Sequence, residues 1–305
     1  MSGILVVVVH MVPPKQILML IHKGQDFPSE IEERLLNYSP SLFTFINDPN
    51  HPLTTRALNI YSNTQRDFKY LTPKRQIKLI DIASHTPKFV HLICSPSRMN
   101  ETIEDLQNLR TGSGQISSHL DQHQITNWSP LFVYEPIPDS CLPENLEKLI
   151  SLSKHIEVFS PNELEARSFI GLITPSDEVP EEIEDIARVF QNHGFKNVVI
   201  RCGKMGAFVL THQESNKGTW VPAMIEDQSK VIDQTGGGNA FLGGLMAGLA
   251  KGLGLVEASY CGAVSAGLTI SQLGLPDMTV DDDGLELWGN LKQVPEELKI
   301  KLMAR

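Results

Sequence analysis

Short apolar runs alternate along the chain with longer stretches in which apolar residues recur at helical spacing. The runs are rich in β-branched and aromatic residues, which favour strands. They cover residues 17–21, 89–94, 131–134, 157–159 and 197–201. Because parallel strands need long crossover connections, strands that alternate with helices are typical of βαβ units. The pattern therefore predicts an α/β protein with a mainly parallel sheet.

Two segments indicate how individual elements begin and end. Residues 180–193 open with a proline and two glutamates and are followed by a glycine. These are boundary signals of a helix. After the run 197–201, a turn that contains Gly203 and Gly206 leads into the apolar run 207–210, which predicts an antiparallel hairpin. We therefore expect a mixed sheet with a returning strand.

Residues 111–130 have weak periodicity and are rich in glycine, serine, glutamine and histidine. This composition predicts a mobile surface insertion. His119 and His123 within it are one candidate for a metal-binding pair, and the acidic run 281–283 is another. Both features also fit solvated loops, which is the interpretation we prefer.

The charge and the cysteines narrow the classes of function. The chain carries 26 basic and 36 acidic residues, a formal net charge of -10, which disfavours direct contact with nucleic acid. Its 305 residues are 41% hydrophobic, enough for a single domain over residues 1–305. The four cysteines are far apart, so they indicate reduced thiols rather than a zinc site. They are Cys94, Cys141, Cys202 and Cys261.

The apolar run 4–9 near the N-terminus does not have the features of a signal peptide. It lacks a basic region before it and ends shortly before Pro13 and Pro14. Neither this run nor any later stretch is long enough to cross a bilayer. We therefore expect a protein of the cytoplasm or nucleus without a membrane partner.

The motif richest in chemistry runs from Asp233 to Phe241 and contains Gly236, Gly237 and Gly238 in a row. Glycines present successive backbone N–H groups without obstruction by Cβ, and the apolar run after them predicts a helix whose positive end faces the same point. The motif thus predicts an anion hole, with a flexible turn as the alternative. Small residues that follow, among them Gly244, predict a close approach of this helix to the sheet.

This motif resembles the C-terminal signature of PfkB-type carbohydrate kinases, Asp-Thr-x-Gly-Ala-Gly-Asp-x-Phe. Asn162 and Glu165 are similar to the family's Asn-x-x-Glu element, and Gly203 and Gly206 to its Gly-x-x-Gly turn beside the nucleotide. Residues 258–274 resemble the helix that flanks the adenine. The resemblance covers about residues 17–290 and implies a ribokinase-like three-layer αβα sandwich.

The resemblance also implies cofactors and their ligands. ATP with Mg²⁺ is expected, with the nucleotide beside the Gly-x-x-Gly turn and its phosphates at Thr235 and the three glycines. Asn162 and Glu165 would organise Mg²⁺ indirectly, and Asp233 is a candidate ligand for a monovalent cation such as K⁺. Residues 54–59, 68–73 and 91–98 look like the fungal "maintenance of killer" branch, whose name implies support of virus-like particles that contain double-stranded RNA.

Two departures from the family pattern bear on activity. Asn239 occupies the position of the aspartate that takes the proton from the acceptor hydroxyl, and an amide cannot act as a base near neutral pH. The family's first strand, part of its lid and its sugar-binding Gly-Gly element have no counterpart, so residues 17–21 would be the second strand of the sheet. Gly24 and Asp26 are interpreted as a structural loop.

These departures leave three functional hypotheses. We prefer a nucleotide-binding pseudo-kinase with little phosphotransfer activity, because the glycines are intact while the base is absent. The alternatives are an active ATP-dependent sugar or nucleoside kinase and a non-enzymatic interaction protein on the kinase fold. For all three the small-molecule acceptor is doubtful, and protein partners are not identified by the sequence.

Overall fold

The structure is a computed structural model and describes residues 16–38, 41–47, 52–62, 65–113, 121–172, 180–212, 218–274, 276, 278–280, 282, 286–288 and 295–304. From Pro13 onward the chain forms two compact units, residues 13–82 and residues 83–305. Two compact units can belong to one domain or to two, so the single domain expected from the sequence stays a prediction. Each unit is described by itself.

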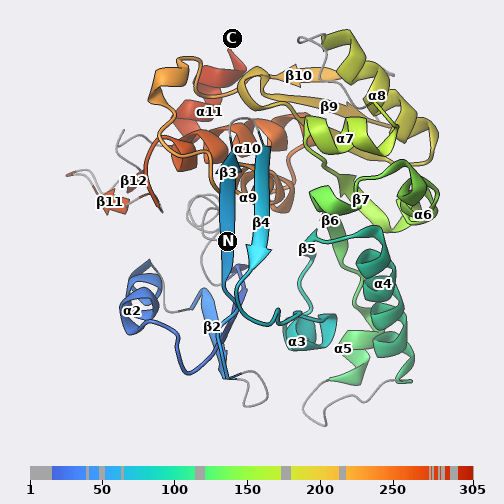
Figure 1. Cartoon of the computed structure of the whole chain (residues 1–305), viewed down its shortest axis with the longest axis vertical. Helices are drawn as coiled ribbons and strands as arrows, with labels where there is room; N and C mark the ends of the chain where they lie inside the picture. The colour runs from blue at the N-terminus through green and yellow to red at the C-terminus, as the bar shows by residue number, and fades with distance from the viewer. Residues whose placement is uncertain are drawn as a thin grey trace. The chain divides into compact units, whose positions relative to one another are not determined.

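A six-stranded sheet forms the centre of residues 83–305 (Figure 1). Its order is β10-β9-β8-β7-β6-β5, and β5 to β8 are parallel while β8, β9 and β10 are antiparallel neighbours. The strands are β5 (Phe89–Ile93), β6 (Leu131–Glu135), β7 (Ile156–Phe159), β8 (Asn197–Arg201), β9 (Ala207–Thr211) and β10 (Thr219–Val221). The predicted parallel runs and the returning hairpin strand are confirmed.

Helices cover the sheet in two layers. Those of the parallel crossovers lie on one face, since consecutive right-handed crossovers that advance in one direction share a face. They are α4 (Pro96–Thr111), α5 (Gln122–Asn127), α6 (Leu146–Ser151), α7 (Glu163–Phe169) and α8 (Pro180–Asn192). The other layer contains α9 (Gly237–Ala250) and α10 (Leu255–Ile270), and α10 contacts β9, β10 and α11 (Pro295–Met303). The three-layer sandwich expected from the sequence is thereby present.

Aromatic side chains fix α7 and α8 against β7. The ring of Phe159 lies 4.9 Å from that of Phe190 and 4.7 Å from that of Phe195, measured between centroids. Phe169 of α7 joins the same cluster, and all four side chains are buried. Because α7 starts at the end of β7, this packing determines where the first turn of α7 lies at the sheet edge.

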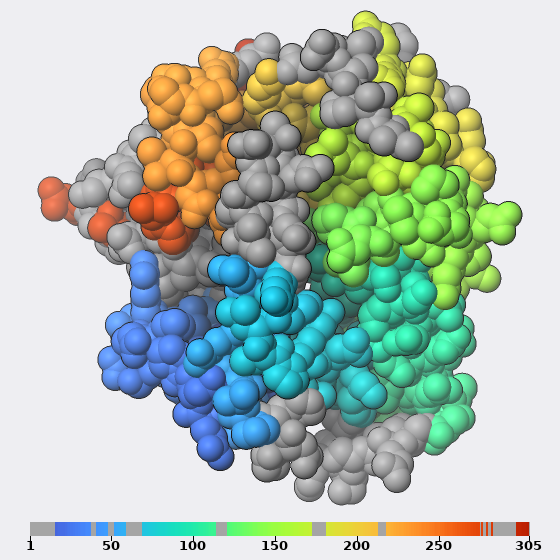
Figure 2. Space-filling view, viewed as in Figure 1, coloured from blue at the N-terminus to red at the C-terminus, as the bar shows by residue number. Residues whose placement is uncertain are grey.

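The second half of the segment 111–130 is more ordered than its composition suggests. Residues 122–127 form α5, capped by the Asp121 carboxylate, and Ile125 and Trp128 are buried. The Trp128 indole donates a hydrogen bond to the Pro87 carbonyl at 2.8 Å. The two buried side chains anchor this half, while most of its other residues are exposed, so it lies at the surface as expected but contains an ordered helix. In Figure 2 the described parts of α4, α6 and α7 share one continuous surface.

The two loop segments considered for metal binding, residues 119–123 and 281–283, are described only in part. His119, Asp281 and Asp283 lie outside the described residues, while His123 and Asp282 are exposed. Within the described ranges, no three histidine, cysteine or acidic side chains gather closely enough to hold a metal ion.

Helices α9 and α10 approach each other closely through small residues. A Cβ on Gly244 would lie 2.5 Å from the Cys261 carbonyl oxygen, and one on Gly248 would lie 2.8 Å from the Ala258 Cα. Both neighbours belong to α10. Gly244 and Gly248 therefore serve helix–helix packing, and the predicted close approach to the sheet is corrected for these two residues.

Residues 13–82 contain two small sheets. β1 (Met19–Lys23) pairs in parallel with β2 (Phe43–Asn47) across the helix α2 (Ser29–Tyr38), and β3 (Ala57–Ser62) pairs antiparallel with β4 (Gln65–Tyr70). The first strand was expected in the central sheet, and the structure corrects this: the βαβ connection through α2 gives β1 a local partner instead. A short helix, α3 (Leu79–Ile82), ends the unit, and a further pair, β11 (Met278–Val280) with β12 (Glu286–Trp288), lies late in the chain.

Gly24 and Asp26 hold a loop of this unit together. The Gly24 N–H donates to the Thr54 hydroxyl at 3.0 Å, and the Thr54 N–H donates to the Asp26 carboxylate at 2.7 Å. Asp26 also pairs with Arg56 at 2.6 Å. The structural interpretation of these two residues agrees with these bonds.

Every described helix is too short or too polar to span a membrane.

Candidate functional site

The glycine motif forms the start of α9. Gly236 is the N-cap residue with φ of 85°, a left-handed conformation that suits glycine. Its carbonyl accepts a hydrogen bond from the Ala240 N–H at 2.8 Å, and the Gly237 N–H donates to the Gln234 carbonyl at 3.2 Å. The N–H groups of Gly238 and Asn239 have no backbone acceptor within the described part of the chain. Two donors at the positive end of a helix suit an anion.

The sides of Gly237 and Gly238 on which a Cβ would stand are already occupied by protein. A Cβ on Gly237 would lie 2.8 Å from the Ile270 Cγ2 atom, and a Cβ on Gly238 would overlap the Arg201 guanidinium. A side chain at either glycine would therefore meet protein atoms on this side. The free N–H groups of Gly238 and Asn239 are thus the part of the motif that remains available for an anion.

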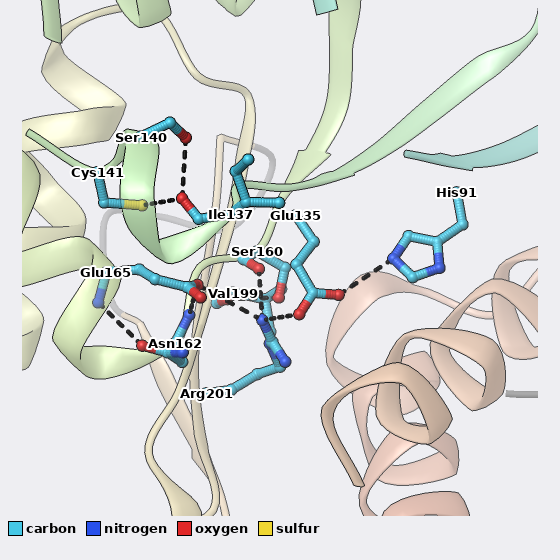
Figure 3. A network of polar contacts seen from close by, with 10 residues as sticks. All are labelled: His91, Glu135, Ile137, Ser140, Cys141, Ser160, Asn162, Glu165, Val199 and Arg201. Atoms are coloured by element: carbon cyan, nitrogen blue, oxygen red, sulfur yellow. Dashed lines mark hydrogen bonds and ion pairs between the residues drawn. The ribbon is translucent and has the colours of Figure 1, made fainter. Parts of the chain in front are cut away.

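Arg201 is the centre of a buried polar network at the same edge (Figure 3). Its Nη2 atom donates to the Glu135 Oε1 atom at 2.8 Å and to the Ser160 carbonyl at 3.1 Å. The second Glu135 oxygen lies 3.2 Å from the Nε2 atom of His91. The three side chains are about nine-tenths buried, with exposures of 10% for Arg201, 12% for Glu135 and 8% for His91. Four neighbouring strands thus contribute to one network.

The electrostatics of Glu135 follow from this network. Burial by itself would raise the pKa of Glu135, but the charge of Arg201 and the hydrogen bond from His91 outweigh burial and lower the pKa to about 2. The carboxylate is therefore ionised near neutral pH, and it neutralises a guanidinium that is equally buried. The Arg201 Nε atom is buried, and no residue in the described ranges accepts a hydrogen bond from it.

Asn162 and Glu165 form a capping box at the start of α7. The Glu165 N–H donates to the Asn162 side-chain oxygen at 2.9 Å, and the Asn162 N–H donates to the Glu165 carboxylate at 2.7 Å. The same Glu165 oxygen lies 3.8 Å from the Arg201 Nη2 atom. Both residues thus have a structural role beside the network, and their organisation of Mg²⁺ stays a prediction.

The Gly-x-x-Gly turn joins β8 to β9 directly after Arg201. Gly206 has φ of 95°, and a Cβ there would overlap the backbone at Val221, so this glycine is required by packing. Gly203 has φ of 52° with open space around it. Before the glycines of α9, the Asp233 carboxylate accepts a hydrogen bond from the Thr235 N–H at 2.9 Å. The nucleotide role of the turn and a K⁺ site at Asp233 stay predictions.

Comparison with known proteins identifies the family. Residues 122–281 match the pfkB family of carbohydrate kinases, just over half of the chain. Protein MAK32 of Saccharomyces cerevisiae is 32% identical over 282 residues, which cover 87% of this chain and 74% of that protein. The chain belongs to the pfkB family. It is similar to the "maintenance of killer" proteins within it.

Two further similarities are to proteins described as kinases. A cytidine kinase of Thermococcus kodakarensis is 33% identical over 132 residues, which cover 43% of each chain. An E. coli protein described as a ribokinase II and solved with ATP and Mg²⁺ has a TM-score of 0.61, covering 100% of this chain and 89% of its own at 16% identity. The second similarity shows the ribokinase-like fold alone.

The structure places the predicted pfkB site residues in two groups. Asn239 is half-buried in the first turn of α9, within the same motif as Thr235 and the glycines. Asn162 and Glu165 lie in the first turn of α7, and the two groups meet at Arg201, which contacts Gly238 and lies near Glu165. The family motifs therefore converge on one edge of the sheet.

Sequence reasoning missed His91, Glu135 and Arg201 as site residues. A signal was present, because Arg201 closes the apolar run 197–201 and Glu135 directly follows the run 131–134. Ligands of parallel sheets bind at the carboxyl ends of strands, so a charged residue at such an end is a candidate. Which of these residues contact one another depends on sheet order and could not be read from spacing.

Proposed function

We propose that this protein is a nucleotide-binding member of the pfkB family with little phosphotransfer activity. The observation that carries the proposal is Asn239 in the first turn of α9, where the family signature has aspartate. The donors for an anion are present beside it, since the N–H groups of Gly238 and Asn239 have no backbone acceptor within the described ranges. The protein would bind a nucleotide phosphate but could not deprotonate an acceptor at this position.

The residues at the edge suit the phosphates of ATP better than a directly bound metal ion. The N–H groups at the start of α9 and the Arg201 guanidinium are donors, and such donors bind phosphate oxygens. The oxygens of Asn162 and Glu165 already accept backbone hydrogen bonds. A bound Mg²⁺ would supply charge neutralisation of the phosphates, and these two residues would act on it through water.

The loss of the base sets the expected rate. A positioned general base typically contributes about 10²- to 10⁴-fold to a reaction rate. Phosphoryl transfer relies mainly on positioning and charge stabilisation, so a slow residual reaction remains chemically feasible. Turnover should therefore lie far below the ordinary kinase range of about 1 to 100 s⁻¹.

Support of virus-like particles that contain double-stranded RNA is the biological role suggested by the similar "maintenance of killer" proteins. The net charge of -10 disfavours a role through direct RNA contact. Such a role would act through a protein partner, with bound nucleotide as its signal. This role and a location in the cytoplasm or nucleus stay predictions.

The proposal is tested by calorimetric titration of the purified protein with ATP, in Mg²⁺ and in EDTA, together with an assay of sugar and nucleoside phosphorylation. We expect saturable ATP binding with phosphotransfer at least a hundredfold below the kinase range. Phosphotransfer at 1 to 100 s⁻¹ would show an active kinase. Absence of ATP binding would favour a non-enzymatic protein on the kinase fold.

A further inference from the structure

Three leucines and a proline form an exposed apolar cluster on and beside α7. Leu164 is 60% exposed, Leu172 is 40% exposed and Leu142 is 39% exposed. Pro143 is exposed as well. The buried face of α7 is filled by other side chains, such as Phe169, so the fold does not need these leucines for its core. Single exposed leucines are common on protein surfaces, whereas a gathered apolar cluster marks an interaction site.

Two contacts hold the members of this cluster on one surface. The Ser168 hydroxyl donates a hydrogen bond to the Cys141 carbonyl. A Cβ on Gly171 would lie 3.8 Å from the Pro143 Cγ atom. Leu164 lies one turn before Ser168 on the same face of α7. The end of α7 and the segment before α6 thus form one apolar surface, in the region where α6 and α7 lie side by side in Figure 2.

Acidic side chains surround this apolar surface. Glu144 and Glu147 are exposed on α6 and the turn before it. Glu163 of α7 and Glu182 of α8 share the buried guanidinium of Arg167, at 3.0 Å and 2.6 Å. Two carboxylates on one guanidinium leave an excess negative charge. The rim of the apolar surface is therefore acidic.

The charge of the rim decides which occupant fits. Lys148 is the exposed basic residue on α6, and its ammonium group donates to the Ser97 hydroxyl of α4 at 2.8 Å. The acidic rim repels the phosphates of nucleic acids and of anionic lipids. A second copy of this chain would bring the same acidic rim against itself, because a two-fold dimer uses one patch twice. A different protein with basic residues around an apolar centre avoids both conflicts.

We propose that Leu142, Pro143, Leu164 and Leu172 form a docking surface for an amphipathic helix of another protein. Apolar residues of that helix would cover the leucines, and its lysine or arginine residues would face the surrounding glutamates. A helix with an apolar stripe between polar flanks is a common ligand of such surfaces. The inference goes beyond nucleotide binding, because it identifies a site for a protein partner and does not require a bound nucleotide.

The experiment is a fluorescence titration with two synthetic helical peptides of about 18 residues, or five turns. Both have the same leucine face, and one is flanked by lysine and the other by glutamate. No nucleotide is added, so a failure of the proposed nucleotide binding leaves the result unaffected. Leu164→Ser and Leu172→Ser each remove one leucine, and Glu144→Lys with Glu147→Lys reverses the charge. Leu273→Ser is the matched control, because Leu273 is exposed after α10, in the other helix layer.

We expect the lysine peptide to bind the parent saturably, and each of the Leu164 and Leu172 variants to weaken binding about tenfold. The Leu273 variant should match the parent. The charge reversal should weaken the lysine peptide and strengthen the glutamate peptide. Urea unfolding of each variant checks that these exposed substitutions leave the fold intact.

Three outcomes would overturn the inference. The first is equal binding of the lysine peptide to the parent and to both leucine variants, or no binding at all. The second is binding of the glutamate peptide to the parent as tight as that of the lysine peptide. The third is a dimer of the parent in analytical ultracentrifugation that is lost in Leu164→Ser, which would assign the surface to a second copy of this chain.

Discussion

In the proposed function, Asn239 is the residue at which catalysis and binding separate. It lies in the first turn of α9, so its backbone N–H contributes to the anion site whatever its side chain is. The side chain decides only whether a proton can be accepted. Binding of a phosphate and transfer of a phosphate therefore depend on different atoms of the same residue.

Asn239→Asp should restore a carboxylate where the dipole of α9 keeps it ionised. We expect ATP turnover to rise tenfold or more, as hydrolysis if no acceptor is held, because water can replace the acceptor. Repulsion from the new charge should also weaken ATP binding in EDTA. Release of phosphate, measured for variant and parent at saturating ATP, checks this. Unchanged turnover with intact ATP binding would show that the missing base is not the limiting defect.

Gly238→Ala should destabilise the fold, because the added methyl group overlaps the Arg201 guanidinium. We expect a loss of about 1–3 kcal/mol in the free energy of unfolding, as for overpacking in a core, although alanine itself favours helix. Urea unfolding of the variant measures the loss. In the Arg201→Gln background the loss should become smaller, and an equal loss in both backgrounds would contradict the contact.

The low pKa of Glu135 predicts a dependence of stability on pH. The pKa falls from an ordinary 4.5 to about 2 in the fold, so the folded state favours the ionised form. The stabilisation is complete above about pH 4.5 and is lost as the pH falls toward 2; it amounts to about 3 kcal/mol at most. The gap in unfolding free energy between the parent and Glu135→Gln should therefore narrow between pH 5 and pH 2. A gap independent of pH would contradict the ion pair.

At the scale of elements, the start of α7 is where a structural and a metal-related role can be separated. Asn162 and Glu165 cap the helix through two reciprocal hydrogen bonds. Glutamine can replace glutamate in a capping box, whereas alanine cannot replace the cap residue. The two positions therefore allow the cap and the charge to be removed one at a time.

Glu165→Gln should keep most of the stability while it lowers the Mg²⁺ dependence of ATP binding, if Glu165 orders water around the ion. Asn162→Ala is the matched comparison, with an expected loss of about 1 kcal/mol in unfolding free energy. Magnesium titrations at fixed ATP and urea unfolding provide the two readouts. If the Mg²⁺ titration of Glu165→Gln matches that of the parent, the role of Glu165 is limited to capping α7.

Elements with a strong local signal were predictable, and contacts between elements were not. Residues 197–201 form a strand with the predicted bounds, because the apolar run and the glycine turn after it agree. α5 was missed because Ile125 and Trp128 gain their burial from tertiary contacts that a weakly periodic sequence does not reveal. In the same way, the glycines could be predicted as site residues from their motif in the sequence. The contact of Arg201 with Gly238 could not, because it joins residues that only the fold brings together.

At the scale of the whole molecule, the net charge affects which classes of partner the protein can bind. The chain has ten more acidic than basic residues, so a phosphate backbone is repelled at long range. A single phosphate group can still bind, since the donors at the start of α9 act within hydrogen-bond distance. We therefore expect the protein to accept a nucleotide, as proposed, and to exclude a polynucleotide.

We expect that the purified protein does not retain double-stranded RNA in a gel-shift assay at physiological salt. Binding to RNA gains most of its free energy from release of counterions by basic side chains, and an acidic surface offers little of this gain. The strongest candidates for a local basic patch, despite the negative net charge, are three exposed lysines that are close in sequence: Lys69, Lys74 and Lys78. Retention of RNA by the parent, lost when these three lysines are replaced by glutamate, would contradict the prediction and move the proposed role in virus-like particles to direct RNA contact. No retention, combined with ATP binding, would leave a protein partner as the route by which such a role is exerted.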